Sequence, residues 1–309
     1  MHSPWIIFLF SVTLVIPSNQ IKILQGNDDG WAEANIRALY QTLKQAGFQS
    51  IISAPAINKS GTGSTSSNWE NLRQPGQYGT IPQGAPGIGH NSSDDHIWYV
   101  NAYPVDGIRY GIDTLSPRFY AQQPDIVVSG PNVGENVSLQ KYFSGTLGAA
   151  LYASERGLPS IAISTDDHHR HSFEKLTSSD SSYIYAKVTI RILNELIRIK
   201  DSGQFLPPKC TLNINLQKSG QGTNCLEASD YKFALTTTFG FSKSLKFNHC
   251  GSKHLPAERK ILKRHDGCWG TVTVIRTRFK DDGTSDEQHS VLMRSPNFFS
   301  CPNSKTINF

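Results

Sequence analysis

The chain has 309 residues, 38% of them apolar, and its 30 basic and 25 acidic residues give a formal net charge of +5. This length is sufficient for one large core with an appendage or for two modest domains, so a folded, enzyme-sized protein is the starting expectation. The charges are spread along the chain, which mildly favours anionic substrates and argues against binding to a nucleic-acid duplex.

Residues 1–20 are typical of a signal peptide. The uncharged apolar run from Trp5 to Ile16 has the length of a signal-peptide core and is too short for a comfortable membrane span. The preceding residues lack Lys and Arg, so a buried N-terminal strand or an uncleaved anchor stays open as an alternative. We expect a secreted, extracellular protein that begins near Ile21 and has no membrane segment after signal removal.

The elements that follow alternate between strands and helices. Strands are expected at residues 21–24, 50–54, 125–129, 160–164 and 212–216, and helices at residues 32–46, 146–156 and 183–197. The helical segments carry apolar residues three and four positions apart, and Gly47 and Gly157 follow two of them as C-terminal caps. Short β-branched runs are typical of strands buried on both faces. The alternation predicts an α/β fold with a doubly wound, mostly parallel sheet.

Two segments depart from this alternation. Residues 61–96 are rich in Gly, Ser, Asn and Pro and have little periodicity, so we expect a long surface excursion or a lid whose structure the pattern does not predict. Beyond the main α/β domain at residues 21–216, the sequence is irregular, with a further strand expected at residues 271–275. We therefore expect a smaller β-rich C-terminal region at residues 217–309.

All the cysteines lie in the last third of the chain: Cys210, Cys225, Cys250, Cys268 and Cys301. No two of them form a CxxC pair, and the wide spacings disfavour a structural zinc site. In an oxidising compartment we expect two disulfides and one unpaired thiol, with the connectivity open. Buried, unpaired thiols are the alternative.

Polar loops follow three of the predicted strands, at residues 27–30, 58–61 and 130–136. Ligands of an open parallel sheet bind beyond the carboxyl ends of its strands, where such loops converge. The adjacent carboxylates Asp28 and Asp29 need a positive partner if both point inward. Oxygen ligands from Asp, Ser and Asn suit a hard cation such as Mg²⁺ or Mn²⁺. Each loop alone could be an ordinary turn, but three converging loops favour a site.

Five ordered motifs occur along the chain: Asn27-Asp28-Asp29-Gly30, Ala54-Pro55 with Lys59-Ser60-Gly61, Tyr103-Pro104-Val105-Asp106, residues 129–136, and Tyr142-Phe143-Ser144-Gly145-Thr146. In order and spacing they resemble the SurE nucleotidase family over about residues 21–216. The resemblance implies an α/β phosphatase that acts on nucleoside 5′- or 3′-monophosphates and other phosphate monoesters. It also implies one divalent metal, Mg²⁺ or Mn²⁺, held by four residues: Asp28, Asp29, Ser60 and Asn132.

Further roles follow from this resemblance and from general chemistry. Asp28 and Asp29 are the expected catalytic residues, with Asp28 orienting or deprotonating the attacking water. Ser144, Gly145 and Thr146 open a helix whose backbone N–H groups could receive phosphate, although Ser144 could equally be an ordinary N-cap. Asn136 is expected to add a hydrogen bond to phosphate. We expect residues 168–171, His-His-Arg-His, to form a solvated loop, with a place in the substrate pocket as the alternative.

Other classes of protein fit less well. A serine hydrolase using Ser60 or Ser144 would leave the paired aspartates unexplained, and the chain has no GxSxG elbow. A dinucleotide-binding dehydrogenase would need a glycine-rich loop where Asp28 and Asp29 stand. The main alternative is a secreted nucleotide- or phosphate-ester-binding protein that has lost turnover. The C-terminal region resembles the family poorly, so a homodimer stays open, as do the preferred ester and the metal.

The potential glycosylation sites provide a first test. Of the Asn-Xaa-Ser/Thr sequons at Asn58, Asn91 and Asn136, two overlap the expected active site, where a glycan would obstruct substrate. We therefore expect glycan at Asn91 only, on a mature chain that starts near Ile21. Peptide mass spectrometry of the secreted protein measures both, and full occupancy of Asn58 or Asn136 in active protein would contradict the placement of the site.

Overall fold

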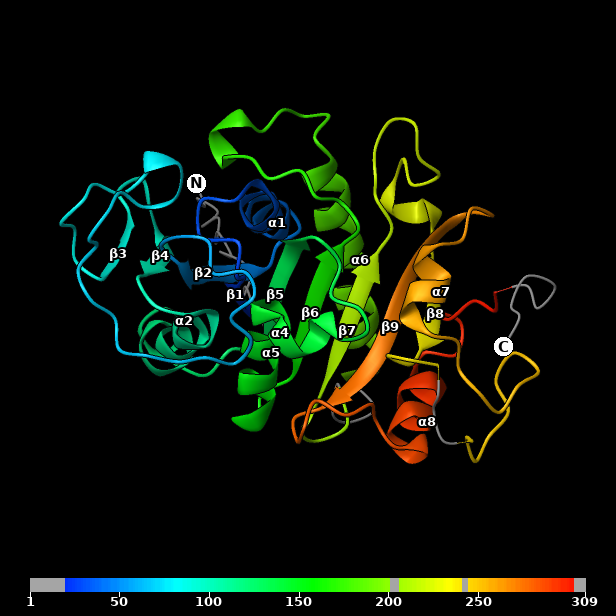
Figure 1. Ribbon diagram of the computed structural model, residues 1–309. Helices are drawn as coiled ribbons and strands as arrows, with labels where there is room; N and C mark the ends of the chain where they lie inside the picture. The colour runs from blue at the N-terminus through cyan, green and yellow to red at the C-terminus, as the bar shows by residue number, and fades with distance from the viewer. Residues whose placement is uncertain (1–19, 201–205, 241–243, 303–309) are drawn as a thin grey trace, which may run out of the picture.

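The computed structural model describes residues 20–200, 206–240 and 244–302, so the predicted signal sequence falls almost entirely outside the described residues. Within this part the chain forms one nine-stranded sheet between two layers of helices (Figure 1). Its strands are β1 (Lys22–Gly26), β2 (Gln49–Pro55), β3 (Ile88–Asn91), β4 (Asp94–Val100), β5 (Ile126–Val133), β6 (Ser160–Thr165), β7 (Cys210–Leu216), β8 (Tyr231–Thr236) and β9 (Cys268–Arg276). They lie in the order β3-β4-β2-β1-β5-β6-β7-β9-β8.

The run from β4 to β7 is parallel, while β3 pairs antiparallel with β4, and β9 pairs antiparallel with β7. The principal helices are α1 (Ala34–Gln45), α2 (Pro104–Tyr110), α3 (Ser116–Tyr120), α4 (Gln140–Phe143), α5 (Gly145–Glu155), α6 (Ser181–Lys200), α7 (Glu258–Leu262) and α8 (Ser285–Arg294). Shorter helical turns are η1 (Gln77–Gly79), η2 (Gly111–Leu115), η3 (Phe173–Lys175) and η4 (Ala228–Asp230). The predicted α/β fold with a mostly parallel sheet is confirmed.

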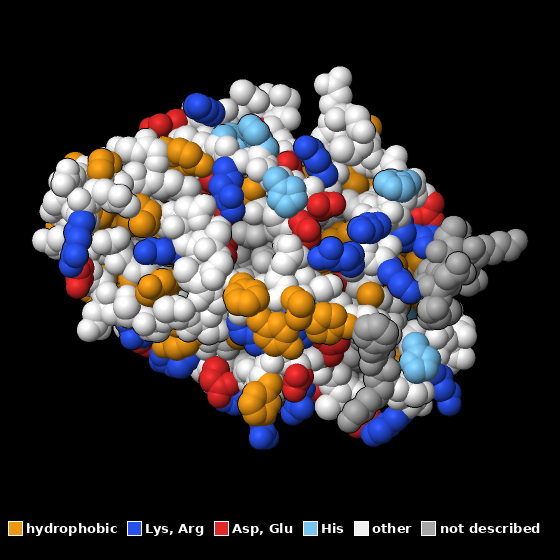
Figure 2. Space-filling view, in the orientation of Figure 1, with side chains coloured by type: hydrophobic (Ala, Val, Ile, Leu, Met, Phe, Trp, Pro, Cys, Tyr) orange, Lys and Arg blue, Asp and Glu red, His pale blue; other side chains and the backbone are white. Residues whose placement is uncertain are grey.

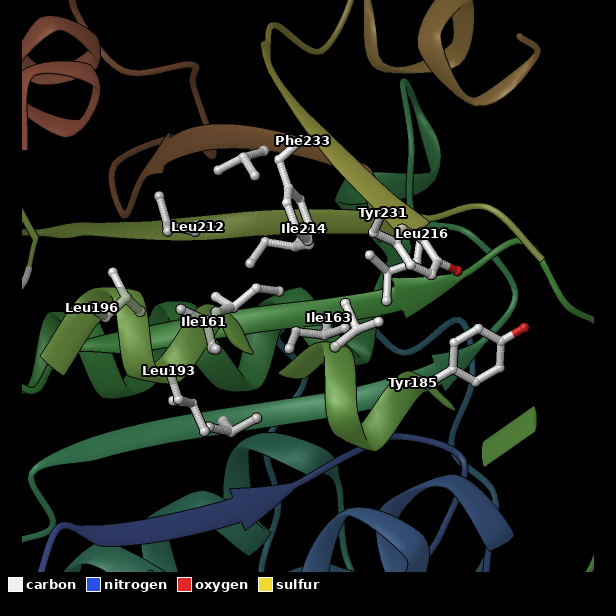
Figure 3. Close-up of a cluster of buried hydrophobic side chains, with 14 of the residues drawn as sticks. Ile161, Ile163, Tyr185, Leu193, Leu196, Leu212, Ile214, Leu216, Tyr231 and Phe233 are labelled. Atoms are coloured by element: carbon white, nitrogen blue, oxygen red, sulfur yellow. The ribbon is translucent and has the colours of Figure 1, made fainter. Parts of the chain in front are cut away.

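Alternate residues of the central strands face opposite layers, because side chains in a strand point to the two sides in turn. Ile23 and Val128 join the cluster beneath α1 and α6, whereas Leu24 and Val127 join the cluster formed with α2 and α5. Figure 3 shows part of the first cluster, in which β6, β7 and α6 pack together. Burial on both faces explains why these strands read as continuous apolar runs.

The strands and helices predicted from periodicity are all present, with shifts at their ends. The largest shift is in β5, which continues past the predicted end at Ser129 to Val133 and so carries Asn132. The excursion contains β3 and the first three residues of β4, Asp94, Asp95 and His96, whose polar character hid the start of that strand. Its apolar residues Leu72 and Ile81 are buried beside α1.

The C-terminal residues extend the same sheet. β9 pairs with β7 from Cys210 opposite Arg276 to Leu216 opposite Gly270, and β8 lies parallel to β9 at the edge. The boundary between two domains at residue 216 stays a prediction, and the strands on both sides of it belong to one sheet. None of the helices in the described ranges is both long and apolar enough to cross a membrane.

The cysteines form two disulfides, Cys225–Cys268 and Cys250–Cys301, and leave Cys210 as a buried thiol. This arrangement confirms the predicted count of two disulfides and one unpaired cysteine. Both bridges lie in the C-terminal region, and Cys225–Cys268 ties the loop before β8 to the start of β9.

Removing the Cys225–Cys268 bridge by the double substitution Cys225→Ala and Cys268→Ala should lower the free energy of unfolding by about 2–4 kcal/mol, because the bridge restricts the unfolded chain. Urea unfolding measures the change, and added reductant should have less effect on this variant than on the parent. Non-reducing peptide mapping that found a different pairing would contradict the expectation.

Candidate active site

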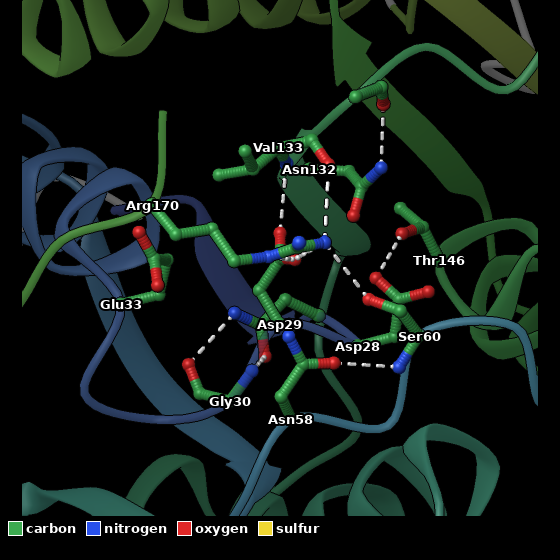
Figure 4. Close-up of polar contacts among 12 residues, drawn as sticks. Asp28, Asp29, Gly30, Glu33, Asn58, Ser60, Asn132, Val133, Thr146 and Arg170 are labelled. Atoms are coloured by element: carbon green, nitrogen blue, oxygen red, sulfur yellow. Dashed lines mark hydrogen bonds and ion pairs between the residues drawn. The ribbon is translucent and has the colours of Figure 1, made fainter. Parts of the chain in front are cut away.

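The site lies where the order of the strands reverses direction. From β1 the chain proceeds to β2 on one side and later returns to β5 on the other, so the loops after these strands diverge and leave a crevice. Asp28 and Asp29 follow β1, Ser60 lies in the loop after β2, and Asn132 is near the end of β5. Figure 4 shows these residues facing a common centre.

Asp28 is buried and is held by the start of α5. Thr146 Oγ1 donates a 2.6 Å hydrogen bond to Asp28 Oδ1, and the backbone N–H of Gly145 donates one of 3.1 Å to Oδ2. The positive end of the helix thus meets a carboxylate. A Cβ on Gly145 would lie only 2.8 Å from Asp28 Cβ, so this contact requires glycine. Burial raises the pKa of Asp28, and these hydrogen bonds oppose the rise.

Asp29 is fully buried and has different partners. The backbone N–H of Val133 donates to Asp29 Oδ2 at 2.7 Å, and Arg170 Nε donates to Oδ1 at 3.0 Å. Burial, and then the charge of Asp28, raise the pKa of Asp29 to about 8, whereas Val133 and Arg170 lower it. One guanidinium therefore opposes two crowded carboxylates. A second positive charge would relieve their repulsion.

Ser60 and Asn132 supply neutral oxygens. Ser60 is exposed, and its Oγ accepts a 3.0 Å hydrogen bond from Arg170 Nη2. Asn132 is buried and donates from Nδ2 to the carbonyl of Gly134 at 2.6 Å, while its Oδ1 has no hydrogen-bond partner among the described residues. Figure 4 shows Asn132 on the side of its loop that faces Asp28 and Ser60. An unpaired buried acceptor is costly, and a cation would satisfy it.

Residues 168–170 lie in an exposed loop, as expected, but Arg170 in that loop also contacts residues of the site. Its guanidinium bonds Asp29, Ser60 and the carbonyl of Val133, and it thereby links three loops of the site. The signal was available in the sequence, because residues 168–171 closely follow the predicted strand at 160–164 and so lie at the same edge of the sheet.

A second group of side chains supports Asp29 and Arg170 from outside. Gln77 Nε2 donates to the carbonyl of Asp29 at 2.7 Å, and the Tyr78 hydroxyl donates to Glu33 Oε2 at 2.6 Å. Glu33 Oε1 also accepts from the backbone N–H of His171 at 3.0 Å, and burial raises the pKa of Glu33. Sequence reasoning missed these residues, because Gln77 and Tyr78 belong to an excursion without periodicity.

The residues predicted to bind substrate have mixed surroundings. Ser144 accepts a 2.9 Å hydrogen bond from the backbone N–H of Leu147 and is thus an N-cap, while Gly145 and Thr146 bind Asp28. Asn136 is buried and donates to Ser164 Oγ at 2.8 Å. The Nδ2 atom that a glycan would occupy therefore already donates to Ser164 in the folded chain. A role of these four residues toward phosphate stays a prediction.

Three clusters of acidic, histidine or cysteine side chains elsewhere in the described residues have the spacing of metal ligands. One includes Cys250 and Cys301, which are joined in a disulfide, and another is the polar stretch at the start of β4. The third, formed by Glu135, Asp166 and His168, lies in the loops after β5 and β6, with His168 largely exposed. None of the three contains Asp28 or Asp29.

Lys141 links the site to the C-terminal region. This lysine of α4 is almost fully buried, and its Nζ lies 3.0 Å from Thr238 Oγ1 and 3.4 Å from Asp282 Oδ1. Asp282 also accepts a 2.9 Å hydrogen bond from the backbone N–H of Thr238. Since α4 leads directly into Ser144 and Gly145, residues after β8 and β9 fix the segment that holds Asp28.

The fold and the site together define a three-layer α/β protein with a buried acidic, oxygen-rich centre at the switch point of its sheet. A sequence profile described as "Survival protein SurE" matches residues 23–238, and the chain belongs to the SurE family. The family expected from the sequence motifs is thereby confirmed.

Two relatives and one solved structure illustrate the similarity. The chain is 32% identical to an acid phosphatase of Yarrowia lipolytica over 309 residues, covering 90% of this chain and 86% of the relative. It is 32% identical to a 5′-nucleotidase SurE of Gloeobacter violaceus over 196 residues, covering 63% and 64%. The crystal structure of the SurE protein from Aquifex aeolicus shares the fold, with a TM-score of 0.57 at 20% identity over 88% of this chain and 98% of that one. Both relatives are named as phosphoric monoester hydrolases, the enzyme class expected from the sequence.

Substituting Arg170→Ala should lower the free energy of unfolding by about 1–3 kcal/mol at pH 9 in the presence of chelator, because Asp29 is then ionised and loses its charged partner. Arg156→Ala is the matched control. Arg156 is as exposed as Arg170 and pairs with Asp113 on the surface, so its loss should cost under about 1 kcal/mol. If urea unfolding gave equal losses of unfolding free energy for Arg170→Ala and Arg156→Ala, a special role for Arg170 would be contradicted.

Proposed function

We propose that the chain is a secreted, divalent-cation-dependent phosphatase that hydrolyses phosphate monoesters, with nucleoside 5′- or 3′-monophosphates as its main substrates. The observation that carries this proposal is the burial of Asp28 and Asp29 side by side, next to the unpaired Oδ1 of Asn132. The names of the relatives, an acid phosphatase and a 5′-nucleotidase, support the substrate class.

The donor set fits a hard divalent cation. Asp28, Asp29, Ser60 and Asn132 would hold it through oxygen atoms, the ligands that Mg²⁺ and Mn²⁺ prefer. The two carboxylates supply negative charge. Asn132 Oδ1 supplies a neutral ligand, and this atom accepts no hydrogen bond from any described residue. When bound, the cation opposes the negative charge of the phosphoryl group and lowers the pKa of water.

The residues of the chain perform the remaining steps. Asp28 is the candidate to orient the attacking water and to accept its proton, since Thr146 and Gly145 hold its two oxygens in place. Arg170 has a forked guanidinium beside Ser60 that can bind phosphate oxygens. Water then adds to phosphorus as the ester P–O bond breaks. The departing alkoxide takes a proton from solvent and leaves as the alcohol, and Asp28 releases the proton it accepted back to solvent. Asn136, Ser144, Gly145 and Thr146 are proposed to support phosphate binding.

The extracellular location belongs to the same proposal. Two disulfides are in keeping with an oxidising compartment, as is the apolar N-terminal sequence. A homodimer is compatible with the proposal and is not needed for the chemistry, because every residue named in the site comes from one chain.

A screen of phosphate esters against the secreted protein, with and without chelator, tests class and cation together. Release of phosphate that stops on chelation and returns with Mg²⁺ or Mn²⁺ supports the proposal. Binding of a nucleotide without phosphate release would instead favour the non-enzymatic alternative, a secreted binding protein.

Asp28→Asn or Asp29→Asn should reduce phosphate release by at least about 100-fold, while Ser60→Ala and Asn132→Ala should reduce it by about 10-fold, because a carboxylate gives a full charge to a cation and a hydroxyl or amide gives only a dipole. Phosphate-release assays beside calorimetric Mn²⁺ titration measure both effects. Asp113→Asn, a surface carboxylate, is the control.

The aspartate variants should remain folded. In chelator at pH 9, where Asp29 is ionised, Asp28→Asn should be at least as stable as the parent, because it removes repulsion between two buried carboxylates. Near-parental turnover in Asp28→Asn, or activity in the parent that chelator does not affect, would contradict the proposed mechanism.

A further inference from the structure

A group of exposed apolar side chains, which we call the apolar ridge, borders the site. It consists of Leu139, Tyr142 and Phe143 at α4 together with Phe239 after β8. Leu139 and Phe143 are each 65% exposed, Tyr142 is 41% exposed and Phe239 is 38% exposed. Figure 2 shows hydrophobic side chains gathered over α4, beside a hollow in the same face of the molecule. Large apolar groups exposed together are typical of binding surfaces.

The ridge is attached to both sides of the phosphate site. Phe143 precedes Gly145, which binds Asp28, by two positions, so the two Cα atoms are at most about 7 Å apart. The carbonyl of Phe143 accepts a 2.8 Å hydrogen bond from the backbone N–H of Gly63, shortly after Ser60. A group esterified to a phosphate at Asp28 and Ser60 would therefore extend within reach of the ridge.

Two aromatic rings of the ridge, those of Tyr142 and Phe239, are held in position. Lys141 Nζ lies 5.3 Å from the ring centre of Tyr142 and 5.6 Å from that of Phe239, and the same lysine pairs with Asp282. Lys280 Nζ also donates to the carbonyl of Tyr142 at 3.1 Å. Because Lys141 and Lys280 restrict Tyr142 and Phe239 in this way, these side chains lose little conformational freedom when a ligand ring packs against them.

We propose that the apolar ridge binds the planar base of a nucleoside monophosphate substrate, and so gives this site a preference for esters whose alcohol part carries an aromatic ring. The inference rests on the proposed function. Aromatic side chains stack on the π-face of any base, so the ridge favours nucleotides over aliphatic esters without selecting one base by hydrogen bonds. Purines, which have the larger face, are favoured over pyrimidines.

The experiment compares adenosine 5′-monophosphate with glycerol 2-phosphate on the full-length secreted protein. Phe143→Ala should lower kcat/KM for the nucleotide by about 5- to 150-fold, the range expected for loss of one stacked base, and leave kcat/KM for the glycerol ester within about twofold. Phe143→Trp should restore the preference. Leu226→Ala, which removes a side chain 57% exposed in the loop before β8, is the control and should change neither value.

Three results would overturn the proposal. Equal loss for both esters would mean that Phe143 only positions Gly145. No loss for either ester, with a parent dimer that becomes monomeric in Phe143→Ala by sedimentation, would identify the ridge as a contact between two copies. If the parent hydrolyses neither ester, the proposed function fails, and calorimetry with adenosine then tests the ridge by itself. Weaker binding of adenosine to Phe143→Ala than to the parent would support a base-binding ridge. Equal binding, or no binding to either protein, would overturn it.

Discussion

The burial of two adjacent carboxylates is the constraint on which the rest of this structure depends. Asp28 and Asp29 are removed from water, and ionised groups tolerate such burial only where charges and hydrogen bonds compensate. Each is compensated in its own way. The start of α5 meets Asp28, whereas Arg170 and the backbone of Val133 meet Asp29. Burial, and then the charge of Asp28, still raise the pKa of Asp29, so a further positive charge would favour its ionised form. This arrangement is the physical basis of the cation site that we propose.

The sheet brings these compensating groups together from distant parts of the chain. Parallel strands direct their carboxyl ends to one edge, and the reversal of order at β1 opens that edge. Close packing then depends on small residues. Gly130 has a φ of +114°, and a Cβ there would meet the carbonyl of Ile163 at 2.1 Å. This irregular stretch of β5 shifts the register against β6 between Ser129 and Asn132. The shift occurs just where Asn132 enters the site, so the irregularity in the strand serves the geometry of the site.

Much of this arrangement could be predicted from the sequence, and the exceptions have physical causes. The core strands and helices were predictable because periodicity reports burial, and Asp28, Ser60 and Asn132 were expected near one another because each follows a strand. Arg170 was missed because a polar tract looks solvated until its partner is known. Gln77 lies in an excursion without periodicity. Its contact to Asp29, like that of Lys141 to Asp282, also spans a long sequence separation that no local pattern encodes. Sequence motifs thus indicated the residues expected to carry the chemistry, but not the residues that position them.

The contact between Lys141 and Asp282 has a consequence for how the protein is made. A chain emerges from the ribosome N-terminus first, and domains fold as their residues become available. Asp28, Ser60, Asn132 and Gly145 are all synthesised long before Asp282, the residue that neutralises buried Lys141 next to them. Until Asp282 and β9 are added, the buried charge of Lys141 lacks the carboxylate of Asp282 that compensates it, and α4 lacks this contact with the C-terminal region. The nascent chain therefore carries the residues of the centre before their support is in place, and the geometry around Gly145 depends on the later addition of Asp282.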